Sequence, residues 1–97
     1  MRASTFKKQL VIPTRKRILI VDDEPFNVIS MLITIDRVGI KGLSSLVDRA
    51  YNGIEALNYV KDSYNSGSHV YGLVITDISM PLMDGYELSD SIRGFYN

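Results

Sequence analysis

The chain has 97 residues, and its 11 lysines and arginines balance its 11 aspartates and glutamates, so the formal net charge is zero. This length allows one domain, and a hydrophobic fraction of 45% is enough for one folded core. The absence of cysteine excludes disulfides, thiolate metal sites and cysteine nucleophiles. No apolar run approaches the roughly 20 residues of a membrane span. We therefore expect a soluble, cytoplasmic segment that makes no membrane contact of its own.

The charge is unevenly distributed along the chain. Residues 1–17 contain six basic residues and no acidic one, so the remainder is acidic. The bases are diluted among Ser, Thr, Gln and Pro, which is more typical of a solvated linker than of a nucleic-acid or membrane contact. We interpret residues 1–16 as a basic N-terminal linker and residues 17–97 as the folded domain.

Short apolar runs alternate with helical patterns, which is typical of βαβ units around a parallel sheet. Residues 18–21 and 73–75 are uninterrupted apolar runs rich in β-branched residues, as expected for central strands covered on both faces. The run at residues 46–50 is shorter and more polar, which favours an edge strand. These runs predict an α/β fold with an open parallel sheet and helices on both faces.

The first predicted helix starts at Pro25, which fits a first helical turn, and ends at Gly39. Its predicted buried stripe has spacings of three and four: Val28, Met31, Leu32, Ile35 and Val38.

Two further helices are predicted from capping-box spacing, at Asn52 with Glu55 and at Asp84 with Glu87. The first of these ends where residues 65–68 break the pattern, and its expected buried face contains Ile54, Leu57, Val60 and Tyr64. The expected buried face of the last helix contains Leu88, Ile92 and Phe95.

Acidic residues follow two of the predicted strands. Asp22 and Asp23 follow the first strand and Asp77 follows the third. In an open parallel sheet ligands bind beyond the carboxyl ends of the strands, where these carboxylates would lie close together. Such a cluster favours a shared proton or a hard cation such as Mg²⁺, beside which a carboxylate can attack phosphorus. The pattern suggests an aspartyl-phosphate site, although the first acidic pair taken alone favours an ordinary acidic helix N-terminus.

An apolar strand and a capped helix flank the motif Asp77-Ile78-Ser79-Met80-Pro81-Leu82-Met83-Asp84-Gly85. This motif resembles the hallmark of receiver domains of two-component response regulators and hybrid histidine kinases, an aspartate followed by x-x-Met-Pro-x-Met-Asp-Gly. Residues 18–25 with Asn27 match the opening strand and acidic pair of that family, and residues 50–57 resemble its middle segment.

The resemblance implies a flavodoxin-like fold with visible strand order 2-1-3. It also implies that Asp77 is the phosphoacceptor and that Ser79 gives a backbone carbonyl to the metal. Asp22 and Asp23 would form the Mg²⁺-binding pair, with Asp23 favoured as the direct ligand. The donor would be the phosphohistidine of a histidine kinase or a histidine phosphotransfer domain. The segment would be a signalling module rather than an enzyme. Its parent would be either a hybrid histidine kinase, which could be membrane-anchored, or a free-standing response regulator, and the sequence does not separate the two.

Family members usually have five strands and five helices, so the resemblance covers only the first three βα units. A hydroxyl residue after the fourth strand and a lysine after the fifth, which contact the phosphoryl group in the family, are missing. We expect the chain to be part of a longer receiver, or an incomplete gene product, with an exposed apolar edge that favours aggregation or partial unfolding.

The missing lysine leaves open an alternative of another class, a degenerate, non-phosphorylated receiver that acts as a protein-interaction scaffold. The intact Asp22, Asp23 and Asp77 argue against it. A phosphatase of the haloacid dehalogenase type is disfavoured, because its Asp-x-Asp motif does not fit residues 22–25. Direct nucleic-acid binding has no support, since no recognition-helix pattern accompanies the receiver motifs.

Overall fold

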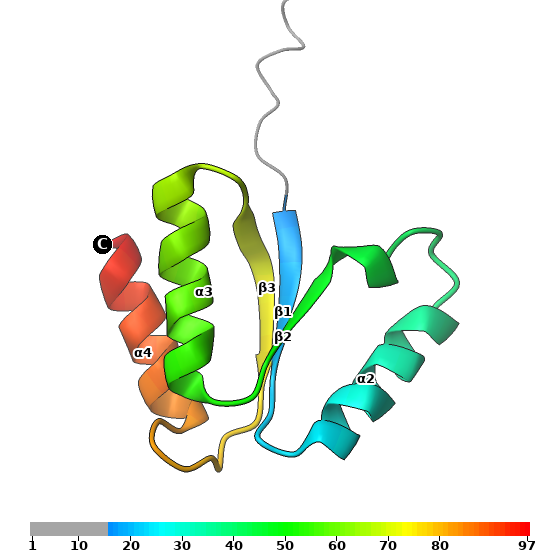
Figure 1. Cartoon of the computed structure of the whole chain (residues 1–97), viewed down its shortest axis with the longest axis horizontal. Helices are drawn as coiled ribbons and strands as arrows, with labels where there is room; N and C mark the ends of the chain where they lie inside the picture. The colour runs from blue at the N-terminus through cyan, green and yellow to red at the C-terminus, as the bar shows by residue number, and fades with distance from the viewer. Residues whose placement is uncertain (1–15) are drawn as a thin grey trace, which may run out of the picture.

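The computed structural model describes residues 16–97, which form a parallel sheet flanked by helices (Figure 1). The elements are β1 (Lys16–Val21), α2 (Pro25–Arg37), the 3-10 helix η1 (Ser44–Leu46), β2 (Val47–Ala50), α3 (Gly53–Ser66), β3 (Val70–Thr76) and α4 (Gly85–Tyr96). The linker predicted at residues 1–16 lies outside the described residues, except for Lys16 in β1. No helix within residues 16–97 is long and apolar enough to cross a membrane.

The sheet has the order β2-β1-β3 with parallel pairing throughout, which confirms the predicted order 2-1-3. β1 lies in the centre, and its last three residues, Leu19, Ile20 and Val21, are at most 1% exposed. Val21 is level with Ala50 of β2 and with Thr76 of β3. The three strands therefore end at the same edge of the sheet, and the residues that follow them are brought together.

β3 differs from the prediction that both of its faces are covered. It lies at an edge of the described sheet, and its Leu73 side chain is 51% exposed. α3 and α4 pack side by side on one face of the sheet, whereas α2 alone lies on the other, close to η1 (Figure 1). Because one helix cannot cover a whole sheet face, the apolar residues of β3 on that side remain partly exposed.

The main core forms between the sheet and the α3–α4 pair, and it consists of Leu19, Val21, Ala50, Ala56, Val60, Met80 and Leu88. The predicted face of α4 is confirmed, since Ile92 and Phe95 pack against this core beside Leu88. In α2, Val28 is fully buried as predicted, but Val38 lies beyond the end of the helix and is 58% exposed.

The predicted buried face of α3 is wrong in two of its four residues. Ile54 and Tyr64 are 46% and 54% exposed, and the residues of α3 that are buried are Gly53, Ala56, Val60 and Ser63. Three of these four residues are small, and Ala56 and Val60 belong to the core between α3 and the sheet. Tyr64 packs instead on α4, with its ring centroid 5.4 Å from that of Phe95 in an edge-to-face arrangement.

Both predicted helix caps form, but only one is a complete capping box. Asp84 accepts a hydrogen bond from the Glu87 amide at 2.8 Å, and the Glu87 carboxylate accepts one from the Asp84 amide at 3.0 Å. At α3, Asn52 accepts from the Glu55 amide at 2.8 Å, whereas the Glu55 carboxylate accepts from the amide of Tyr51 rather than from that of Asn52. The complete box fixes the start of α4 directly after the loop that follows β3.

Candidate functional site

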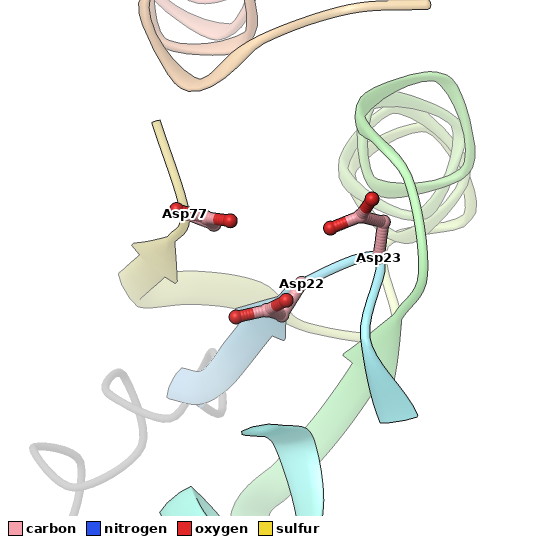
Figure 2. Close-up of side chains that lie close together, drawn as sticks. All are labelled: Asp22, Asp23 and Asp77. Carbon is pink, nitrogen blue, oxygen red and sulfur yellow. The ribbon is translucent and has the colours of Figure 1, made fainter. Parts of the chain in front are cut away.

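Three carboxylates meet at the carboxyl edge of the sheet. The hydrogen-bond ladder continues one residue beyond the strands, because the Asp22 amide donates to the Ala50 carbonyl at 3.2 Å and the Asp77 amide donates to the Val21 carbonyl at 3.0 Å. Asp22, Asp23 and Asp77 each offer one carboxylate oxygen, and these three oxygens lie within 4.8 Å of one another. Figure 2 shows the side chains of Asp23 and Asp77 pointing toward one another, with Asp22 beside them at the end of β1.

The three carboxylates have different surroundings. Asp22 is buried, Asp77 is half-buried and Asp23 is exposed. The Asp22 Oδ1 atom accepts a hydrogen bond from the Glu24 amide at 3.0 Å, which forms an Asx-turn, and another from the Asn27 side-chain amide at 3.4 Å. Within residues 16–97, none of the three carboxylates forms an ion pair with a basic side chain. The negative charge of this cluster is therefore not compensated by the described part of the protein.

The donor set fits a hard divalent cation. Mg²⁺ binds oxygen ligands octahedrally at about 2.1 Å, so two of its ligand atoms lie about 3 to 4 Å apart. The spacing of the three carboxylate oxygens, within 4.8 Å, approaches this range. Ser79 lies in an exposed position two residues after Asp77, and no donor within residues 16–97 hydrogen-bonds to its carbonyl oxygen. The carbonyl predicted as a ligand is thus free of competing donors among the described residues.

The loop between β3 and α4 packs closely against two helix starts. The Gly85 amide donates to the Ile78 carbonyl at 2.8 Å, and a Cβ atom at Gly85 would lie 2.5 Å from the Asp77 carbonyl oxygen. A Cβ atom at Gly53, the first residue of α3, would lie 2.7 Å from the Met83 carbonyl oxygen. Only a residue without a Cβ atom permits these two close contacts. The contacts at Gly85 and Gly53 therefore fix the position of the loop that contains Ser79, whose carbonyl is the predicted metal ligand.

The same loop contains a strained residue. Leu82 has a φ of 71°, and the Met83 amide donates to the Pro81 carbonyl at 2.8 Å. This combination describes a γ-turn centred on Leu82, a conformation that side chains with a Cβ atom rarely adopt. The sequence motif predicts a proline-shaped loop here, but it gives no sign that a leucine occupies the strained position.

A second polar cluster lies away from the acidic edge and joins all three strands. Arg17 of β1 donates from Nε and Nη2 to the Asp48 carboxylate of β2, each at 2.9 Å, and the Tyr71 hydroxyl of β3 donates to the same carboxylate at 2.6 Å. The hydrogen bond from Arg17 lowers the pKa of Asp48, and burial raises the pKa of Tyr71. His69 lies in the loop between α3 and β3, with its ring against that of Tyr71.

These four residues lie in three separate sequence segments, so the contacts could not be predicted without the register of the strands. The sequence also did not identify Gly53 as a packing residue, although a glycine at the first position of a helix was a usable signal.

The strand order 2-1-3 in an open parallel α/β sheet is that of the flavodoxin-like fold, and here carboxylates gather at the carboxyl ends of its neighbouring strands. The family model described as "Response regulator receiver domain" matches residues 18–97. The chain therefore belongs to the receiver domain family of two-component signal transduction, and it is a signalling module of that family.

Similar proteins include both sensor kinases and response regulators. The chain is 33% identical over 87 residues to "Sensor protein EvgS" of Escherichia coli strain K12, a match that covers 90% of this chain and 6% of EvgS. It is 38% identical over 80 residues to "Two-component response regulator ORR41" of Oryza sativa subsp. japonica, covering 80% of this chain and 56% of that protein. The solved structure of a two-component transcriptional regulator AraC from Clostridium phytofermentans matches with a TM-score of 0.63 and 33% identity, covering 84% of this chain and 60% of the other. The chain thus spans less than two thirds of each of these proteins.

Proposed function

We propose that this chain accepts a phosphoryl group onto Asp77 from the phosphohistidine of a histidine kinase or of a histidine phosphotransfer domain. The observation that supports this proposal is the cluster of three carboxylates at the carboxyl edge of a receiver fold, none of which has a basic partner among residues 16–97. The proposed Mg²⁺ ligands are Asp22, Asp23, Asp77 and the Ser79 backbone carbonyl, with Asp23 favoured over Asp22 as the direct ligand.

The transfer requires little more than a positioned nucleophile. A carboxylate oxygen of Asp77 attacks phosphorus, the P–N bond to the donor imidazole breaks, and its electron pair returns to the imidazole nitrogen, which takes up a proton. Bound Mg²⁺ would neutralise charge on the incoming phosphoryl group. The backbone of Asp77 is fixed for this role by its hydrogen bond to the Val21 carbonyl and by the close contact with Gly85.

In this proposal residues 17–97 form the receiver and residues 1–16 link it to another part of the parent protein. Phosphohistidine donors of two-component systems face the cytoplasm, so we place the domain there. The module acts as a phosphoacceptor rather than as an enzyme with turnover of its own.

The test is intact-mass spectrometry of the chain after incubation with acetyl phosphate, with and without Mg²⁺. We expect one phosphoryl adduct that requires Mg²⁺ and that is absent from Asp77→Asn. A matched control is Asp36→Asn, which removes an exposed carboxylate near the far end of α2 and should leave the adduct intact. No adduct on a chain that circular dichroism shows to be folded would refute phosphorylation and favour the interaction scaffold.

A further inference from the structure

Among the three carboxylates of the acidic cluster, Asp22 is the one whose side chain accepts hydrogen bonds from other described residues. It is 8% exposed, and both of its donors, the Glu24 amide and the Asn27 side-chain amide, act on the same oxygen, Oδ1. Within residues 16–97 no donor hydrogen-bonds to its other oxygen, Oδ2. One oxygen is therefore held by the protein and the other is available to a cation or to a water molecule bound to it.

The two donors are of different kinds, because one is a backbone amide and the other is a side-chain amide. The Glu24 amide belongs to the Asx-turn, which any residue at position 24 other than proline would preserve. The second donor is the side-chain amide of Asn27, the third residue of α2. A side chain at this position can reach back to the residues that precede the helix. Asn27 is therefore the donor that a substitution can remove without altering the turn.

Holding one oxygen matters because the terminal torsion of an aspartate is broad. A carboxylate with free rotation presents either oxygen over a wide range of angles, whereas one with two donors on Oδ1 presents Oδ2 in a narrow range. Residues that hydrogen-bond to metal-binding carboxylates typically change metal affinity 10–100-fold when they are removed.

We infer that Asn27 is a positioning residue of the metal site, which acts by orienting the Asp22 carboxylate. This inference rests on the proposed function, because it requires the acidic cluster to bind a divalent cation. At 3.4 Å the hydrogen bond from Asn27 is longer than usual, so removing it is expected to weaken metal binding by about tenfold, the lower end of that range.

The test uses the full chain and Mn²⁺ alone, with electron paramagnetic resonance measuring the free ion. Asn27→Ala is compared with wild type and with Asn58→Ala, a control that removes an exposed asparagine of α3 whose side chain makes no hydrogen bond within residues 16–97. Asn27→Leu, which keeps the branched shape of the side chain but removes the donor, serves as a second variant. Both Asn27 variants should raise the Kd for Mn²⁺ about tenfold, and Asn58→Ala should leave it unchanged.

A double-mutant cycle separates positioning from a general structural effect. In an Asp22→Ala background, Asn27→Ala should weaken Mn²⁺ binding no further, because the carboxylate that it orients is absent. An equal weakening in both backgrounds, or a Kd for the Asn27 variants within twofold of wild type, would overturn the inference. A wild-type chain that is folded and binds no Mn²⁺ would instead refute the metal site of the proposed function, and this inference with it.

Discussion

Replacing Gly85 by alanine tests whether the loop after β3 is as closely packed as the structure indicates. The added methyl group would lie 2.5 Å from the Asp77 carbonyl oxygen and 2.9 Å from the Ile78 Cα atom. Both are backbone atoms, so no side-chain rotation relieves the overlap, and overpacking of this kind costs about 1–3 kcal/mol. Alanine regains at most about 1 kcal/mol through its higher helix propensity. We expect Gly85→Ala to lower the free energy of unfolding by about 1–2 kcal/mol.

The same helix supplies a matched control. A Cβ atom at Gly94 would have no heavy atom within 4 Å, and the residue lies inside α4. Gly94→Ala should therefore raise the free energy of unfolding by about 0.5–1 kcal/mol, as expected for removing a glycine from a helix. Urea denaturation followed by far-ultraviolet circular dichroism measures both variants, and the two changes should have opposite signs.

Equal gains of stability in both variants would refute close packing at Gly85, because the loop would then move away from the methyl group without cost. A loss in Gly85→Ala has a further consequence, since the Asp77 carbonyl and the following residues must shift to make room. Mn²⁺ affinity should fall in Gly85→Ala and stay at the wild-type value in Gly94→Ala. A destabilised Gly85→Ala with unchanged Mn²⁺ affinity would show that the strain is absorbed on the α4 side of the contact.

Two further predictions concern strain and pH. Leu82→Gly should raise the free energy of unfolding by about 1 kcal/mol in urea denaturation, because it relieves backbone strain of about 1–3 kcal/mol and the entropic cost of a glycine is smaller. A loss of stability would mean that the exposed leucine makes contacts that outweigh the strain. The lowered pKa of Asp48, caused mainly by Arg17, contributes stability that is present above the pKa of the unfolded carboxyl group and is lost as the pH falls below about 4. The raised pKa of Tyr71 contributes stability that is lost as the pH rises above about 10. The free energy of unfolding, measured across pH, should therefore fall at both the acid and the alkaline end. The loss of stability at acid pH should be smaller in Asp48→Asn, and the loss at alkaline pH should be smaller in Tyr71→Phe. Unchanged pH profiles in these variants would contradict the roles given to Asp48 and Tyr71.

The arrangement of the strands was predictable because it follows from strong sequence signals. The apolar run before Asp22 is too uniformly hydrophobic for an exposed strand, and the structure buries it in the centre of the sheet. The topological rule for parallel sheets then placed Asp22 and Asp77 at one edge, although they are far apart in the sequence. The hallmark motif around Asp77 added the family, which the comparison with known receiver domains confirms.

The features that were not predicted depend on contacts between elements. Periodicity predicts that large apolar residues such as Ile54 and Tyr64 lie on the buried face of α3, but the face that is buried carries the small side chains of Ala56 and Ser63 instead. The γ-turn at Leu82 follows from the packing of the loop rather than from the residue itself, since leucine disfavours a positive φ.

The positions of the two polar clusters mean that stability and metal binding can be altered separately. Asp48 is level with Leu19, whereas the acidic cluster begins after Val21 at the carboxyl edge of the sheet. Three residues of strand separate the two clusters by about 10 Å, which is about the Debye length at ordinary ionic strength. Direct electrostatic coupling between them is therefore weak. A variant of Asp48 that loses Mn²⁺ affinity would do so by loosening the pairing of β2 with β1, and its Mn²⁺ affinity and unfolding free energy should then fall together.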